Sequence, residues 1–72
     1  MATDRTLSIR VNGEHRRVAA GLTLGGLVAE LGLDAAKVGV ERNLEVAPRS
    51  TLADTAVEDG DDIEIITFVG GG

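Results

Sequence analysis

The residues best suited to chemistry in this 72-residue chain are its last three, Gly70, Gly71 and Gly72. Glycine has no Cβ, so a glycine tail can thread a narrow active-site channel in conformations that other residues cannot adopt. Such a tail presents one unobstructed carboxylate, on Gly72. Because a carboxylate is a poor electrophile, an ATP-dependent enzyme would first have to convert it to an acyl-adenylate. The alternative interpretation is an idle, frayed chain end, which is common in proteins.

Side chains elsewhere in the sequence offer little for catalysis. The chain has no Cys, which excludes disulfides, thiolate metal ligands and a cysteine nucleophile. Its single histidine, His15, lies in a polar segment typical of an exposed sheet edge, and Ser50 and Thr51 have no neighbouring base in the sequence. The acidic segment 58–62 lacks the spacing of an EF-hand loop. We therefore predict no catalytic residue, no metal site and no cofactor, in a protein that is not itself an enzyme.

The charge of the chain restricts its partners. A net charge of −5 argues against nucleic acid, whose recognition usually needs a basic surface. We interpret the acidic stretch near the C-terminus as a solvated loop, with steering of a basic partner as the alternative. Its members are Asp54, Glu58, Asp59, Asp61, Asp62 and Glu64. No apolar run is long enough for a signal peptide or a membrane span, so we expect a soluble cytoplasmic protein that is monomeric when free.

The elements that must hold the tail begin with a predicted hairpin. Residues 6–11 alternate between apolar and polar side chains, as a half-buried strand does. The dipeptide Asn12-Gly13 favours a type I′ turn, and the polar residues 14–18 then return as a strand at the edge of the sheet.

A helix follows, with Thr23 as its predicted N-cap and Gly32 as its stop. One face of it is apolar at the i, i+3, i+4, i+7 spacing, through Leu24, Leu27, Val28 and Leu31. Two internal glycines, Gly25 and Gly26, lower its intrinsic stability, so we expect the helix to depend on docking against the sheet.

The second half of the chain predicts three further strands. They cover residues 38–42, 45–47 and 63–69, with turns at 43–44 and 58–61 and a single helical turn at 50–53. The last strand is the most apolar, so we place it in the centre of the sheet, parallel to the first strand. This order predicts an α+β fold, with one mixed sheet and a helix packed on one of its faces.

The alternation of the last strand separates two sets of side chains. If the helix covers the face of Ile63 and Ile65, then Ile66 and Phe68 are left partly exposed beside the tail. Exposed apolar residues at that place suggest contact with a partner, although Phe68 shielding the end of the sheet is the alternative. Our candidate partner-binding residues are Ile66, Phe68 and the following Val69.

Two segments carry a resemblance to a known family. Residues 40–50 read Val-Glu-Arg-Asn-Leu-Glu-Val-Ala-Pro-Arg-Ser, and residues 60–72 read Gly-Asp-Asp-Ile-Glu-Ile-Ile-Thr-Phe-Val-Gly-Gly-Gly. Together they closely resemble the ThiS family, the sulfur carriers of bacterial thiamine biosynthesis, and the resemblance covers essentially the whole chain. It implies the ubiquitin-like β-grasp fold, which we assign to residues 1–69, followed by a flexible glycine tail at residues 70–72.

The resemblance also implies a reaction cycle. The carboxylate of Gly72 would be adenylated by an E1-like enzyme of the ThiF type and converted to a thiocarboxylate with cysteine-derived sulfur. The thiocarboxylate would then donate its sulfur to a thiazole synthase of the ThiG type, which builds the thiamine thiazole. Gly70 and Gly71 would be the flexible arm that carries the reacting group.

Three alternatives remain open at this point. The small subunit of molybdopterin synthase resembles this pattern and also ends in Gly-Gly, but it typically approaches the glycines through a Pro-Pro-Val-Ala type of segment, where this chain has Thr67-Phe68-Val69. A ubiquitin-like modifier would use the same adenylated tail to form isopeptide bonds with lysines. A β-grasp binding module with an idle tail would use neither reaction.

Overall fold

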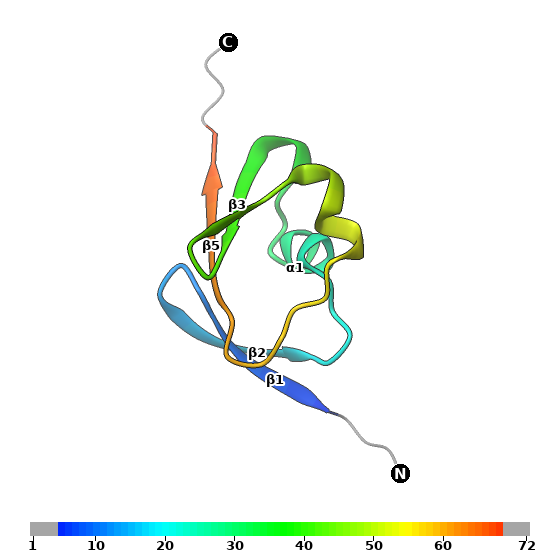
Figure 1. Ribbon diagram of the computed structural model, residues 1–72, viewed down its shortest axis with the longest axis vertical. Helices are drawn as coiled ribbons and strands as arrows, with labels where there is room; N and C mark the ends of the chain where they lie inside the picture. Colours follow the sequence, from blue (N-terminus) through cyan, green and yellow to red (C-terminus); the bar gives the residue numbers. More distant parts are fainter. Residues whose placement is uncertain (1–4, 69–72) are drawn as a thin grey trace.

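The computed structural model describes residues 5–68, and Figure 1 shows their arrangement. The predictions for Val69, Gly70, Gly71 and Gly72 lie outside these described residues. The elements, in chain order, are β1 (Thr6–Val11), β2 (Glu14–Ala19), α1 (Leu24–Glu30), η1 (Ala35–Lys37), β3 (Val38–Arg42), β4 (Glu45–Ala47), η2 (Arg49–Asp54) and β5 (Asp62–Thr67). The predicted α+β class is confirmed, and the short 3₁₀ helix η1 is the element that the sequence analysis missed.

The sheet has five strands in the order β2-β1-β5-β3-β4. β5 is central, as predicted, and runs parallel to β1 but antiparallel to β3. The polar strand β2 lies at one edge and the three-residue strand β4 at the other. β5 ends at Thr67, two residues before the predicted end, and the predicted helical turn at 50–53 is the longer 3₁₀ helix η2.

Two turns have positive φ at both central residues, and only the first, Asn12-Gly13, has the residues that favour it. Asn12 and Gly13 have φ angles of 53° and 84°, and Asn43 and Leu44 have φ angles of 53° and 72°. Positive φ at both central residues defines the type I′ turn, whose twist matches that of the flanking strands. The Asn12 side chain also accepts a hydrogen bond from the backbone N–H of Ile65, at 2.8 Å, so the first turn is tied to the central strand.

The helix α1 is capped and docked as predicted. Thr23 Oγ1 accepts a hydrogen bond from the backbone N–H of Gly26 at 3.0 Å. A Cβ on Gly25 would lie 3.3 Å from backbone atoms of Leu52 in η2, so glycine at this position allows the two helices to approach closely. None of the helices within residues 5–68 has the length and apolar character needed to cross a membrane.

One face of the sheet carries the core and the other is open. α1 and η2 both lie on the same side of strands β3 and β5 (Figure 1). On that side Ile63 and Ile65 are buried, whereas Ile66 and Phe68 on the opposite face are 53% and 58% exposed. The predicted division of the last strand is therefore confirmed. Within residues 5–68 the buried hydrophobic side chains are all Ile, Leu or Val: Ile9, Val11, Val18, Leu24, Leu27, Val28, Val38, Val40, Leu52, Val57, Ile63 and Ile65.

Candidate functional site

The candidate site lies where β5 ends. In Figure 1 this end of β5 points away from β1 and β2. Thr67 pairs with Val38 in β3, and the backbone N–H of Phe68 donates a hydrogen bond to the carbonyl of Lys37, the last residue of η1, at 3.0 Å. Phe68, the last residue that the structure describes, is therefore held at the junction of η1 and β3, next in sequence to the predicted tail.

An apolar patch, which we define as Val46, Ile66 and Phe68, lies on the open face of the sheet beside this end. Ile66 is directly opposite Gly39 in the pairing of β5 with β3. A Cβ on Gly39 would lie 3.3 Å from the Phe68 ring, so the ring lies against this glycine. Phe68, Val46, Gly39 and Pro48 line a hollow of about 200 Å³. The predicted exposure of Ile66 and Phe68 is confirmed, and their contact with a partner stays a prediction.

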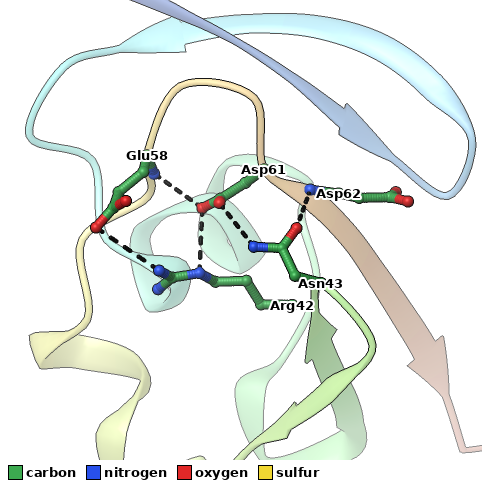
Figure 2. Close-up of polar contacts among 5 residues, drawn as sticks. All are labelled: Arg42, Asn43, Glu58, Asp61 and Asp62. Atoms are coloured by element: carbon green, nitrogen blue, oxygen red, sulfur yellow. Dashed lines mark hydrogen bonds and ion pairs between the residues drawn. The ribbon is translucent and has the colours of Figure 1, made fainter.

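A polar network fixes the other end of β5, where the strand begins (Figure 2). Its centre is Asp61, which is only 5% exposed. One carboxylate oxygen of Asp61 lies 3.3 Å from Arg42 Nε and accepts a hydrogen bond from the backbone N–H of Glu58 at 2.8 Å. The other oxygen accepts a hydrogen bond from the Asn43 side-chain amide at 3.1 Å. Both oxygens of this buried carboxylate therefore have partners, as a buried charge requires.

Asn43 extends the network into the backbone of β5. Its side-chain oxygen accepts a hydrogen bond from the backbone N–H of Asp62 at 2.9 Å, and its own backbone N–H donates to the carbonyl of Asp62 at 2.8 Å. Asn43 is also the first residue of the turn between β3 and β4. The network therefore joins that turn to the first residue of the central strand.

Our interpretation of the acidic stretch as a solvated loop was wrong for one member. Glu58, Asp59, Asp62 and Glu64 are exposed, but Asp61 is buried. Pairing with Arg42, which the antiparallel arrangement of β3 and β5 brings to it, compensates for the removal of this carboxylate from water. No local sequence signal separates Asp61 from its acidic neighbours, because its burial depends on the pairing that brings Arg42 of β3 beside the start of β5.

The remaining candidate side chains have structural contacts. His15 is exposed and hydrogen-bonded to the hydroxyl of Ser8. The Thr51 hydroxyl donates to the carbonyl of Pro48 at 2.7 Å. Within residues 5–68, no three His, Cys, Asp or Glu side chains come together in a way that could hold a metal ion.

Comparison with known proteins places the chain in a family. The model of the ThiS family matches residues 9–72, which include both ends of β5 and the terminal glycines. The chain belongs to the ThiS family. Its five-stranded mixed sheet with one main helix is the β-grasp fold, as predicted.

Solved and curated relatives agree with this membership of the ThiS family. The crystal structure of the thiamine biosynthesis protein (ThiS) from Geobacter metallireducens superposes with a TM-score of 0.78 at 38% identity, covering 92% of this chain and 100% of that one. The chain is also 50% identical over 66 residues to a thiazole synthase of Paramagnetospirillum magneticum and 42% identical over 66 residues to one of Magnetococcus marinus. In both cases 92% of this chain is covered but only 20% of the relative, so the chain spans a fifth of their length.

The polar network predicts a large effect of one buried carboxylate on stability. We expect Asp61→Ala to lower the free energy of unfolding by about 3 kcal/mol, because Arg42 loses its closest partner and two further donors lose their acceptor. Urea unfolding followed by circular dichroism measures this change. The matched control is Glu58→Gln, because the Glu58 carboxylate lies 3.7 Å from Arg42 and is 71% exposed. We expect this control to change stability by less than about 0.5 kcal/mol. Equal losses in the two variants would contradict the central role of Asp61.

Proposed function

We propose that this chain is a sulfur carrier of thiamine biosynthesis and that the carboxylate of Gly72 carries the sulfur. The observation that supports this most strongly is the match of the ThiS family model over residues 9–72, which extends through all three terminal glycines. The names of the relatives, a thiamine biosynthesis protein and two thiazole synthases, agree with this pathway.

The proposed chemistry takes place on the tail and uses the catalytic groups of other proteins. The Gly72 carboxylate attacks the α-phosphorus of ATP on an adenylating enzyme of the ThiF type, which forms the acyl-adenylate and releases pyrophosphate. Sulfide-level sulfur supplied by a cysteine-derived donor then attacks the acyl carbon, and AMP leaves, which gives the thiocarboxylate. On the thiazole synthase the sulfur passes to the substrate and an oxygen from the substrate or water takes its place on the acyl carbon, so the carrier returns to the carboxylate form. In this cycle the carrier is a co-substrate and not an enzyme.

The short tail limits how far the active site of an adenylating enzyme can lie from Phe68. Four residues, 69–72, follow Phe68 in the sequence. A fully extended chain of that length spans at most about 14 Å. An enzyme that acts on the Gly72 carboxylate must therefore bring its active site within that distance of Phe68. The apolar patch of Val46, Ile66 and Phe68 lies inside this zone and would be covered by the enzyme.

The two thiazole synthase relatives support the choice of the second partner. Each contains a segment of 66 aligned residues that is 42–50% identical to this chain. This segment makes up only 20% of each relative. Joining two proteins in one polypeptide raises their effective concentration for each other. We therefore assign a thiazole synthase as the acceptor of the carried sulfur.

The tail provides the direct test of this function. After incubation with the host's adenylating enzyme, ATP and a sulfur donor, the intact mass of the wild-type chain should rise by the difference between one sulfur and one oxygen. A variant with one Ala appended after Gly72 should not gain this mass, because its terminal carboxylate is displaced and carries a Cβ beside it. Deletion of Gly72 should have the same effect.

Both tail variants should unfold at the same temperature as the wild type, because neither alters the core. If the Ala-extended chain, shown by its mass to be unprocessed, still acquired sulfur at the normal rate, the carrier function would have to be abandoned. Isopeptide-linked products in place of the thiocarboxylate would instead favour the modifier alternative.

The pathway has a separate test in the host. A deletion strain should require thiamine for growth, and the thiazole moiety alone should restore growth, because the missing step precedes the formation of thiazole. The matched measurement is molybdoenzyme activity, which should be unchanged. Growth without thiamine together with lost molybdoenzyme activity would assign the carrier to molybdopterin synthesis.

The apolar patch predicts a loss of recognition without a loss of fold. Because Ile66 and Phe68 are more than half exposed, changing either to Asp should leave the domain folded. We expect kcat/KM for adenylation to fall at least about tenfold, since a charge would occupy the centre of an apolar contact. Leu44→Asp is the matched control, because Leu44 is 89% exposed but lies in the β3–β4 turn, near the opposite end of β5. A similar fall in all three variants would show that the effect is not specific to this patch.

A further inference from the structure

Arg49 belongs to the segment 40–50 that carries the family resemblance, but neither the polar network nor the chemistry of the tail gives it a role. Its guanidinium group donates hydrogen bonds to two backbone carbonyls. Nε donates to the carbonyl of Ala35 at 3.0 Å, and Nη2 donates to that of Val38 at 3.3 Å. These carbonyls stand at the two ends of the segment 35–38, which consists of η1 and the first residue of β3.

The same short segment and the residue after it hold Phe68. The carbonyl of Lys37, between the two carbonyls that Arg49 binds, accepts a hydrogen bond from the Phe68 backbone N–H at 3.0 Å. The ring of Phe68 lies against Gly39, where a Cβ would be 3.3 Å from it. Phe68 is therefore held once through its backbone and once through its ring.

The segment 35–38 depends on contacts from outside, because η1 is only three residues long. Short 3₁₀ helices have poorer hydrogen-bond geometry than α-helices and little stability of their own. The Asp34 side chain caps η1 by accepting a hydrogen bond from the backbone N–H of Ala36 at 2.9 Å. At the other end of the segment, the side-chain contact comes from Arg49.

Arg49 reaches this segment from a well-anchored position at the start of η2. The carbonyl of the preceding Pro48 accepts hydrogen bonds from the Thr51 backbone N–H at 2.9 Å and from the Thr51 hydroxyl at 2.7 Å. Leu52 is buried, and its backbone lies close to Gly25 of α1. Because hydrogen bonds from a charged donor are stronger than those between neutral groups, Arg49 ties the junction of η1 and β3 to the helical layer of the domain.

We propose that Arg49 is a positioning residue for the reactions at the tail. Through the segment 35–38 it holds Phe68, and Phe68 is the point from which the tail extends. The inference rests on the proposed function and applies to both partner enzymes, because both act on the same carboxylate. Four residues follow Phe68 and span at most about 14 Å, so a loosely held Phe68 spreads the positions that the Gly72 carboxylate can reach. Misalignment of a bound reactant lowers its rate of reaction.

The test uses the full chain with two substitutions of Arg49. Arg49→Gln removes the charge and the forked donor group, whereas Arg49→Lys keeps the charge and loses the fork. Amide hydrogen exchange followed by NMR reports on the Phe68 N–H, and pyrophosphate release by the host's adenylating enzyme gives kcat and KM for the carrier. The matched control is Arg16→Gln, because Arg16 is exposed on the edge strand β2 and its change alters the net charge equally.

We expect the Phe68 amide to exchange about tenfold faster in Arg49→Gln, and by a smaller factor in Arg49→Lys. The Asp62 amide, bonded to the Asn43 side chain at the start of β5, should exchange as in the wild type. Over the same two variants kcat should fall, by about five- to tenfold in Arg49→Gln, while KM stays within about twofold. General destabilisation would instead speed exchange at both amides and would not separate kcat from KM.

The other outcomes each overturn the inference. A Phe68 amide that exchanges at the wild-type rate in Arg49→Gln would show that Arg49 does not hold this segment. An unchanged kcat, with or without a raised KM, would show that the position of Phe68 does not limit the reaction. Wild-type values in Arg49→Lys would assign the role to charge alone, and an equal fall in Arg16→Gln would assign it to net charge.

Two further readings keep the outcome decisive. If Arg49→Gln does not fold, Arg49→Lys decides by the same two measurements. If the wild-type carrier gains sulfur while the Arg49 variants react at the normal kcat, the proposed function stands and only the positioning role fails. If the wild type is not adenylated at all, both fail together.

Discussion

The placement of the central strand β5 is the constraint on which the rest of the structure depends. Side chains along a strand alternate, so a shift of one residue would exchange its two faces. Ile63 and Ile65 would then leave the core, and Ile66 and Phe68 would enter it. Backbone hydrogen bonds hold the strand from both sides, because the N–H of Arg10 donates to the Asp61 carbonyl and that of Asn43 to the Asp62 carbonyl. The buried Asp61 carboxylate adds side-chain contacts to β3 at the same point, so the register is fixed where the strand begins.

Local signals predicted most of the fold because each depends on a few adjacent residues. Asn12 tolerates a positive φ and Gly13 adopts one freely because it has no Cβ, and Thr23 caps α1 through a hydrogen bond from the backbone N–H of Gly26, three residues away. The burial of Asp61 was not predictable in this way. It depends on Arg42, nineteen positions earlier in the sequence, and on the pairing that brings β3 beside β5. In the sequence Asp61 is one of several neighbouring acidic residues, and only the register of β3 against β5 shows that it is the buried one.

In the candidate site, too, features formed within one strand were predictable and features formed between strands were not. The exposure of Ile66 and Phe68 followed from the alternation of one strand and from the expectation that the helix covers one face. The opposition of Glu41 and Glu64 needed the register of β3 against β5, which no local pattern contains. The contact of the Phe68 ring with Gly39 likewise depends on two strands that are distant in sequence. Features formed within one element were therefore predictable, and features formed between elements were not.

Two exposed features of the domain are unfavourable for its stability. Phe68 is the only aromatic residue of the chain, yet it lies outside a core made of Ile, Leu and Val. Full burial of such a side chain stabilises a protein by about 1.5–3 kcal/mol, and a domain of this size has little stability in excess. The like-charged pair of Glu41 and Glu64 on the same face is a second unfavourable arrangement. Both features lie on the open face of the sheet, and Phe68 directly follows the end of β5, whereas the compensating polar contacts of Asp61 lie at the start of that strand. One end of β5 therefore contributes stability, and the other leaves exposed the apolar side chains that a partner enzyme would cover under the proposed function.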